Sequence, residues 1–224
     1  HILDTVHEFL QLGLPYEINM LYANKHNEFF YPYSSTILFR FGARGNMPPC
    51  DVTWYDGVDN LPPLPAGYGE SELGADIPAS NQGEYTKQKI NPGKIIYSKD
   101  LIFKGASHGS TLSIIPKEKA EEMKDKLPKV PKSPSNHYVN FLRACQGVEK
   151  TRSPFEINGV LSQVFCLGVI AQRLNTQLFF DPRNKVFTNT PIGPTVCTQN
   201  QQPAVCTRLY SYAEDVNLGF QTIC

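Results

Sequence analysis

The stretch "SPFEINGVLSQVFCLGVIAQRLNTQLFFDPRNKVFTN" (residues 153–189) carries the strongest structural signal in this sequence. Residues 153–175 are mostly apolar over several helical turns, which predicts a helix that packs against a sheet. Residues 176–189 hold two apolar runs on either side of an Asp-Pro turn, and this pattern predicts a strand and a turn. The stretch therefore predicts a helix that leads back into a sheet.

The segments before this stretch predict most of that sheet. "PYEINMLYAN" (15–24), "STILFRFGAR" (35–44) and "CDVTWYDG" (50–57) have the alternation of strands, and the last two predict an antiparallel hairpin. In the second of these strands three apolar residues alternate with three others, namely Ile37, Phe39 and Phe41 against Thr36, Leu38 and Arg40. Two further β-rich runs, 95–103 and 111–115, flank a glycine-containing turn and predict a second hairpin. Residues 60–93 are rich in Pro, Gly, Ser and Asn, which indicates a long loop or insertion.

Three more segments predict helices. "HILDTVHEFLQLG" (1–13) has an apolar stripe at helical spacing, made of Ile2, Leu3, Val6, Phe9, Leu10 and Leu12. It lacks an N-cap residue and an initiator Met, so we expect this chain to be a fragment of a longer polypeptide. Residues 117–127 predict a charged, exposed helix. Residues 135–147 predict a helix with Ser135 as its cap, Gly147 as its stop and an apolar stripe of Tyr138, Phe141, Leu142 and Cys145. The predicted fold class is α+β, with a mostly antiparallel sheet covered by helices on one face.

Composition narrows the classes of partner. The 224 residues contain 21 Lys and Arg and 21 Asp and Glu, so the net charge is zero and neither nucleic acid nor an anionic membrane surface is an expected partner. Apolar runs such as 164–171 are too short to span a bilayer. The six cysteines show no CxxC pair and no Cys/His cluster at metal spacing, so no metal site is predicted. Three of the cysteines, Cys50, Cys145 and Cys166, have the pattern of buried small hydrophobic residues.

Five residues could take part in binding or chemistry, each with an ordinary structural alternative. His1 and Asp4 lie one helical turn apart, so the carboxylate could orient the imidazole for proton transfer, although exposed helix residues more often face solvent. Trp54 lies on a strand, where its ring could pack in the core or could form a platform on which a sugar stacks. Arg44, beside a glycine, could bind a carboxylate or hydroxyls or be a surface arginine. His137 lies near a helix start, where it could face a pocket, cap the helix or face solvent.

Several segments together resemble one known family. Residues 1–13, 43–57 ("ARGNMPPCDVTWYDG"), 102–112 ("IFKGASHGSTL") and 136–189 resemble, in this order, the C-terminal domain of the Gfo/Idh/MocA family of NAD(P)-dependent sugar oxidoreductases, in the variety common in Bacteroidetes-like bacteria. The resemblance covers residues 1–191, with the insertion at about 60–93. Residues 192–224 form an atypical tail that does not resemble the family.

The resemblance implies a fold and a role. The fold would be the large open antiparallel sheet of a dihydrodipicolinate-reductase-like C-terminal domain, which binds the sugar substrate and forms a homo-oligomer through its sheet. His1 matches the family's catalytic histidine, which acts in proton transfer at the substrate hydroxyl, and Asp4, Arg44, Trp54 and His137 would be substrate-binding residues. NAD or NADP would bind a Rossmann domain that these residues do not contain, so the chain alone is expected to bind no cofactor and to be inactive.

Two alternatives to a sugar dehydrogenase stay open at this point. The family also contains NAD-dependent glycosidases, which cleave glycosides through transient oxidation. A non-enzymatic sheet domain that binds carbohydrate or a partner subunit would fit the same segments. The resemblance implies a bacterial protein of the cytoplasm or periplasm, and it distinguishes neither the sugar nor NAD from NADP.

Overall fold

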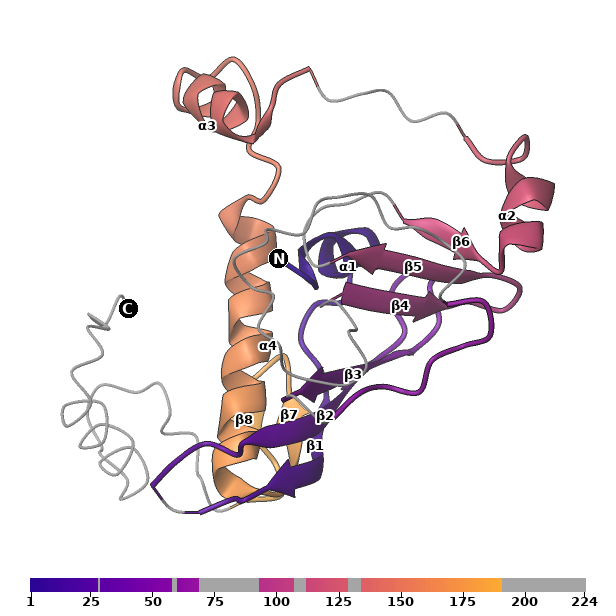
Figure 1. Cartoon of the computed structure of the whole chain (residues 1–224). Coiled ribbons are helices and arrows are strands. Elements are labelled where there is room, and N and C mark those ends of the chain that lie inside the picture. The colour runs from indigo at the N-terminus through magenta and orange to yellow at the C-terminus, as the bar shows by residue number, and fades with distance from the viewer. Residues whose placement is uncertain (28, 58–59, 69–92, 107–111, 129–133, 191–224) are drawn as a thin grey trace.

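The computed structural model describes residues 1–27, 29–57, 60–68, 93–106, 112–128 and 134–190. Over these residues the chain is an α+β protein with antiparallel strands, as predicted, but the strands form two sheets and not the single sheet that was expected (Figure 1). The larger sheet has the strand order β3-β2-β1-β7-β8, with bounds β1 (Glu17–Asn24), β2 (Ser34–Phe41), β3 (Cys50–Asp56), β7 (Gln177–Asp181) and β8 (Val186–Phe187). The smaller sheet has the order β4-β5-β6, with bounds β4 (Gly93–Tyr97), β5 (Ile102–Ala106) and β6 (Ser113–Ile115).

The core lies between the larger sheet and the helix α4 (Phe155–Leu174). Ile37 and Phe39 of β2 are buried on the face of the sheet that packs against α4. Both side chains lie close to Gly168 of the helix. The side chain on the other face of β2, Leu38, is also buried. The side chains of β2 therefore alternate between the two faces of the sheet as predicted, but this alternation does not separate buried from exposed residues.

Helix α4 confirms the predicted helix and has one buried face. Its fully buried residues follow helical spacing and are Leu161, Val164, Leu167, Gly168 and Ala171. By length and composition alone α4 is apolar enough to cross a membrane, but a helix that packs in a protein core meets the same criteria. Its packing on the sheet accounts for much of this apolar character, since a core helix needs the same residue types.

The opening helix α1 (Asp4–Phe9) is shorter than predicted and packs against α4. Leu3, Val6 and Leu12 join the core, whereas Phe9 has 71% of its surface exposed, so the predicted stripe is wrong at this residue. The side chain of His7 is buried on the same helix and its Nε2 lies 3.0 Å from the Gly13 carbonyl oxygen. This hydrogen bond links α1 to the turn that ends it.

Helix α2 (Lys117–Met123) is exposed, as predicted, whereas α3 (His137–Cys145) differs from its prediction. The helix is capped by Asn136, whose side chain accepts a hydrogen bond from Val139 N at 2.9 Å, and not by Ser135. The predicted apolar stripe does not pack on the sheet and is exposed at Tyr138, Phe141 and Leu142. The reason is visible in Figure 1, where α3 stands beyond the end of α4 and away from both sheets.

Polar contacts replace an apolar core around α3. The Glu149 carboxylate accepts hydrogen bonds from Ser135 Oγ at 2.6 Å, Asn140 Nδ2 at 2.8 Å and Arg143 Nη1 at 2.9 Å. These three donors lower the pKa of Glu149 to about 2, with Ser135 the largest cause. The predicted stop is confirmed, since Gly147 follows the helix with a φ of +73°.

The second predicted hairpin is confirmed by the antiparallel pairing of β5 with β6, and the structure adds a further hairpin that was not predicted. The run 95–103 is divided by a tight turn in which Ser98 N donates to Leu101 O at 2.9 Å, so β4 and β5 form the hairpin there. The predicted turn at 105–109 begins inside β5 and continues into residues outside the described part. Of the predicted insertion, 60–68 are described as a loop and 69–92 lie outside the described residues, as does the tail 192–224.

The three described cysteines do not match the prediction that they are buried. Cys50 is half-buried at the start of β3, whereas Cys145 and Cys166 are exposed. Cys145 is exposed because α3 stands apart, and Cys166 because it lies on the face of α4 opposite the sheet. All three are free thiols.

Candidate functional site

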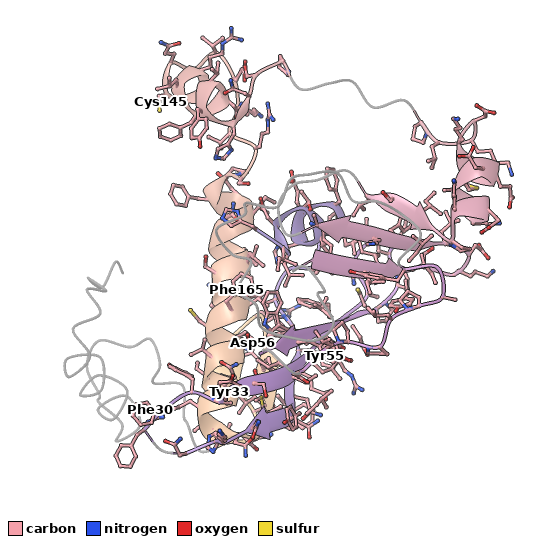
Figure 2. The ribbon with its side chains drawn as sticks, in the orientation of Figure 1. Phe30, Tyr33, Tyr55, Asp56, Cys145 and Phe165 are labelled. Carbon is pink, nitrogen blue, oxygen red and sulfur yellow. The ribbon has the colours of Figure 1, made fainter. Side chains whose placement is uncertain are left out.

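A cleft of about 560 Å³ lies between α1, the edge strand β3, the loop 60–68 and the edge strand β4. Its wall is mostly apolar and includes Val6, Leu10, Trp54, Leu61, Tyr68 and Lys94. The volume falls within the range of small-molecule sites, roughly 300–1,000 Å³. Figure 2 shows the position of its β3 wall through the neighbouring side chains Tyr55 and Asp56.

Asn60 fixes one wall of the cleft. Its side-chain amide donates to Ser35 O at 2.7 Å and to Thr36 Oγ1 at 3.0 Å, both on β2. A further hydrogen bond to Asp56 O, at 3.2 Å, reaches the end of β3. Because one side chain joins the loop to two strands, the loop 60–68 holds its place over the cleft without a hydrophobic core of its own.

Trp54 lies in the wall of the cleft and also contacts the core. Its strand partner is Ile37, and its ring meets the edge of Phe165 of α4 with centroids 6.2 Å apart and the planes at 68°. Tyr55 follows it on β3 and points to the other face of the sheet, beside Thr36. The ring of Trp54 therefore packs against the core and also borders the cleft, and the sugar-stacking platform stays a prediction.

Lys94 is a residue of the site that the sequence did not predict. Only 9% of its surface is exposed, and its Nζ donates to the Ala106 carbonyl oxygen at 3.0 Å. Burial lowers the pKa of its amine, and the Asp4 carboxylate acts in the opposite direction. Gly105 of β5 pairs with Lys94 and leaves space for its side chain. If residue 105 had a Cβ, that atom would lie 3.0 Å from Lys94 Cε. That glycine is the only sequence signal for the buried lysine.

Asp4 joins three parts of the chain. Its Oδ2 accepts a hydrogen bond from Ser153 Oγ at 2.6 Å, just before α4. Its Oδ1 is buried and has no hydrogen-bond partner in the described part of the chain. The Asp4 carboxylate raises the pKa of the Lys94 amine, and Lys94 lines the cleft whereas Asp4 does not. His1 lies one turn before Asp4 and is exposed.

The other predicted residues lie elsewhere. The guanidinium of Arg44 donates to Leu10 O at 2.9 Å, Gly42 O at 2.7 Å and Pro48 O at 3.0 Å, so it ties the end of α1 to a neighbouring loop. His137 is exposed on α3, where its ring meets Tyr138 edge to face, away from the cleft. The structure thus brings Asp4 and Trp54 to the region of the cleft, with His1 nearby, and does not bring His137 there.

Neither a metal site nor a dinucleotide site is formed by the residues that the structure describes. They contain no group of three His, Cys, Asp or Glu side chains that could hold a metal ion. Every strand pair among them is antiparallel, whereas the dinucleotide-binding fold needs parallel strands joined to a helix by a glycine-rich turn. The described part of the chain therefore contains no strand–helix–strand unit of that kind.

The chain is defined by these features as an α+β protein with a small-molecule-sized cleft and a buried lysine beside a carboxylate. No family model, no curated protein and no solved structure matches it.

Proposed function

We propose that this chain is the substrate-binding and oligomerisation domain of an NAD(P)-dependent sugar oxidoreductase of the Gfo/Idh/MocA family, with that family's dihydrodipicolinate-reductase-like sheet. The observation that supports this most is the cleft, because an aromatic ring and a buried amine line the same 560 Å³ space. A sugar offers an apolar ring face and several hydroxyls, so it needs both kinds of wall. Trp54 supplies the apolar surface, and Lys94 supplies a donor.

Proton transfer belongs to the corner where α1 meets β4. His1 takes the proton of the substrate hydroxyl in this proposal, and Asp4, one helical turn on, orients the imidazole. Lys94 donates a hydrogen bond to the same hydroxyl oxygen and stabilises the negative charge that develops on it. The low exposure of Lys94 strengthens that stabilisation, since water screens the amine poorly there.

The nicotinamide cofactor, which accepts the hydride from a ring carbon, is assigned in this proposal to a Rossmann domain outside the described residues. Oligomerisation is assigned to the face of the larger sheet opposite α4. That face carries a polar network in which Arg40 Nη1 meets Glu17 Oε2 at 3.1 Å and Gln177 Nε2 donates to Glu17 Oε1 at 2.7 Å. Such a network suits a hydrogen-bonded interface better than an apolar one.

Binding of sugars by the chain itself tests the proposal. Trp54 is the only tryptophan, so its fluorescence reports on the cleft without a label. We expect one class among neutral hexoses, amino sugars and uronates to change that fluorescence in a saturable way, with calorimetry giving the same affinity. Lys94→Met should weaken binding by about tenfold, the usual effect of one hydrogen bond to a charged group. Lys99→Met, on the exposed β4–β5 turn, is the matched control and should bind normally.

Two results would contradict the proposal. One is the absence of any saturable change with all three sugar classes. The other is binding that Lys94→Met and Lys99→Met leave equally intact, because the sugar would then lie outside the cleft. If a sugar binds and His1→Ala leaves nicotinamide reduction by the assembled enzyme unchanged, His1 has no part in proton transfer; if a sugar binds and the assembled protein binds and reduces no nicotinamide, the non-enzymatic carbohydrate-binding alternative replaces the oxidoreductase.

A further inference from the structure

The outward face of α4 carries a regular stripe that neither the cleft nor the core uses. We call the outer stripe the six residues at alternating steps of four and three along this face: Phe155, Gly159, Ser162, Cys166, Val169 and Arg173. Phe155 is 92% exposed and Val169 is 41% exposed. Steps of four and three are the spacing by which one helix packs along another. The two small residues near the middle of the stripe, Gly159 and Ser162, permit close approach of a second helix backbone.

An exposed apolar patch lies beyond each end of α4. Beyond its N-terminal end is the α3 patch, formed by Tyr138, Phe141 and Leu142. Beside its C-terminal end is the aromatic loop between β1 and β2, formed by Phe29, Phe30, Tyr31 and Tyr33. His26 Nε2, 3.1 Å from the Arg173 carbonyl oxygen, fixes that loop to the end of the helix. In Figure 2, Cys145 of α3 and Phe30 of the loop both project to the side of α4 away from the sheets.

The aromatic loop is ordered although its rings face solvent. The Asn27 side chain accepts hydrogen bonds from Phe29 N and Phe30 N, both at 2.9 Å. The Lys25 ammonium stands 5.4 Å from the centre of the Tyr33 ring. These contacts organise the loop in advance, so a partner would not have to order it on binding.

We propose that the outer stripe is a dimer interface in which α4 of a second copy of this chain packs antiparallel against it. A twofold axis between Ser162 and Cys166 aligns Ser162 with Cys166 of the second copy and Gly159 with Val169. Antiparallel pairing also places the positive N-terminal end of each helix beside the negative C-terminal end of the other. The same axis brings the α3 patch of each copy to the aromatic loop of the other, because the two patches lie at opposite ends of one helix.

The exposed surface is large enough for such a dimer. Eight side chains of the stripe and the two patches have more than half of their surface exposed, and they are Phe29, Phe30, Tyr31, Tyr33, Tyr138, Phe141, Leu142 and Phe155. Since aromatic side chains bury 150–250 Å² each, these carry about 1,000 Å² of exposed surface per copy. A stable interface needs about 800 Å² from each partner. A second copy therefore covers three apolar surfaces that are exposed among the described residues of a single chain.

The test measures self-association of the full chain by sedimentation equilibrium with three substitutions. Gly159→Leu is the main variant, because a Cβ at Gly159 meets nothing within 4 Å in one chain, so the fold tolerates it while the second helix is pushed away. Val169→Glu buries an unpaired carboxylate in the interface. Leu21→Glu, on β1 at a residue that is 53% exposed, is the matched control for association through the larger sheet. Circular dichroism checks that each variant folds.

We expect Val169→Glu to raise the dissociation constant of the α4 dimer by roughly 100-fold and Gly159→Leu by at least about tenfold. Leu21→Glu should act only on the separate association through the larger sheet and leave the dissociation constant of the α4 dimer unchanged. The proposal is overturned if the unaltered chain is monomeric at tens of micromolar, or if Leu21→Glu dissociates the oligomer and the α4 variants do not. Binding of a monomeric chain to neutral phospholipid vesicles, lost in Val169→Glu, would also overturn it and assign the stripe to a membrane surface.

Discussion

Two glycines on the same helix allow the packing of α4 on the sheet to be measured directly. Gly159 and Gly168 both lie inside α4, so replacing either with alanine gains the same helix propensity, about 1 kcal/mol. They differ in their surroundings. A Cβ at Gly159 meets nothing within 4 Å, whereas a Cβ at Gly168 would stand 2.7 Å from Phe39 Cζ and 3.3 Å from Phe39 Cε1.

The contact at Gly168 cannot be relieved cheaply. Phe39 is 3% exposed and lies on β2 between the paired residues Ile18 and Val52, so its ring has little space to move. Forcing an extra methyl group into a packed core costs about 1–3 kcal/mol. We therefore expect Gly159→Ala to raise the free energy of unfolding by about 1 kcal/mol. Gly168→Ala should lie about 1–3 kcal/mol below Gly159→Ala, at or beneath the unaltered chain.

Urea unfolding followed by circular dichroism gives both values. The measurement is made at a concentration where the chain is monomeric, so that self-association does not contribute. In thermal unfolding the two variants should differ by roughly 2–4 °C for each kcal/mol. Equal stabilisation by both alanines would refute the reasoning, because it would mean that Gly168 does not face Phe39 closely.

Three further predictions follow from the polar contacts. Asn60→Ala should lower the free energy of unfolding by about 1–3 kcal/mol, because it leaves buried groups on β2 unpaired, and it should raise hydrogen exchange in the loop 60–68. The pKa of Glu149 falls from its usual 4.5 to about 2 in the folded chain, so the stability that its carboxylate contributes is complete above about pH 4.5 and is lost as the pH falls to about 2. Amide hydrogen exchange in α3 should therefore increase as the pH falls over this range. Glu149→Gln should abolish that pH dependence. Burial lowers the pKa of Lys94 below its usual 10.5, so the unfolded chain binds the proton more tightly than the folded chain and the free energy of unfolding should rise as the pH approaches 10.5. Lys94→Met should reduce this rise in a series of denaturation curves measured at increasing pH. An unchanged pH profile in Lys94→Met would contradict the burial of Lys94.

Local patterns in the sequence were sufficient for the elements whose partners are near in the chain. The strands β1, β2 and β3 alternate and follow one another directly in the chain, so their order in the sheet follows from adjacency. Helix α4 was predictable because its apolar residues cover far more than one turn. The α+β class and the antiparallel pairing followed from these elements together.

The errors share a physical cause. The spacing of apolar residues shows that one face of a helix or strand is apolar, but it does not show which other element packs against that face. The apolar stripe of α3 is real in the sequence, yet Phe141 and Leu142 are each more than 60% exposed because no sheet lies under them. The site was harder still. Lys94 and Asp4 are distant in the sequence, and a lysine in a strand is typical of an exposed edge, so only the fold reveals that Lys94 lines the cleft and that the Asp4 carboxylate acts on its amine.

The pairing of β1 with β7 has a consequence for how the chain is made. Ile18, at the centre of the sheet, pairs with Leu178, and both side chains are fully buried. While a ribosome extends the chain, β1, β2 and β3 emerge early, but the helix that covers their apolar face and the strand that completes their hydrogen bonds emerge near residue 180. Until then the nascent meander has an open edge at β1 and an uncovered face, so synthesis is the period of greatest aggregation hazard. Synthesis rate and chaperone supply should therefore limit the yield of this protein more than the stability of its finished fold.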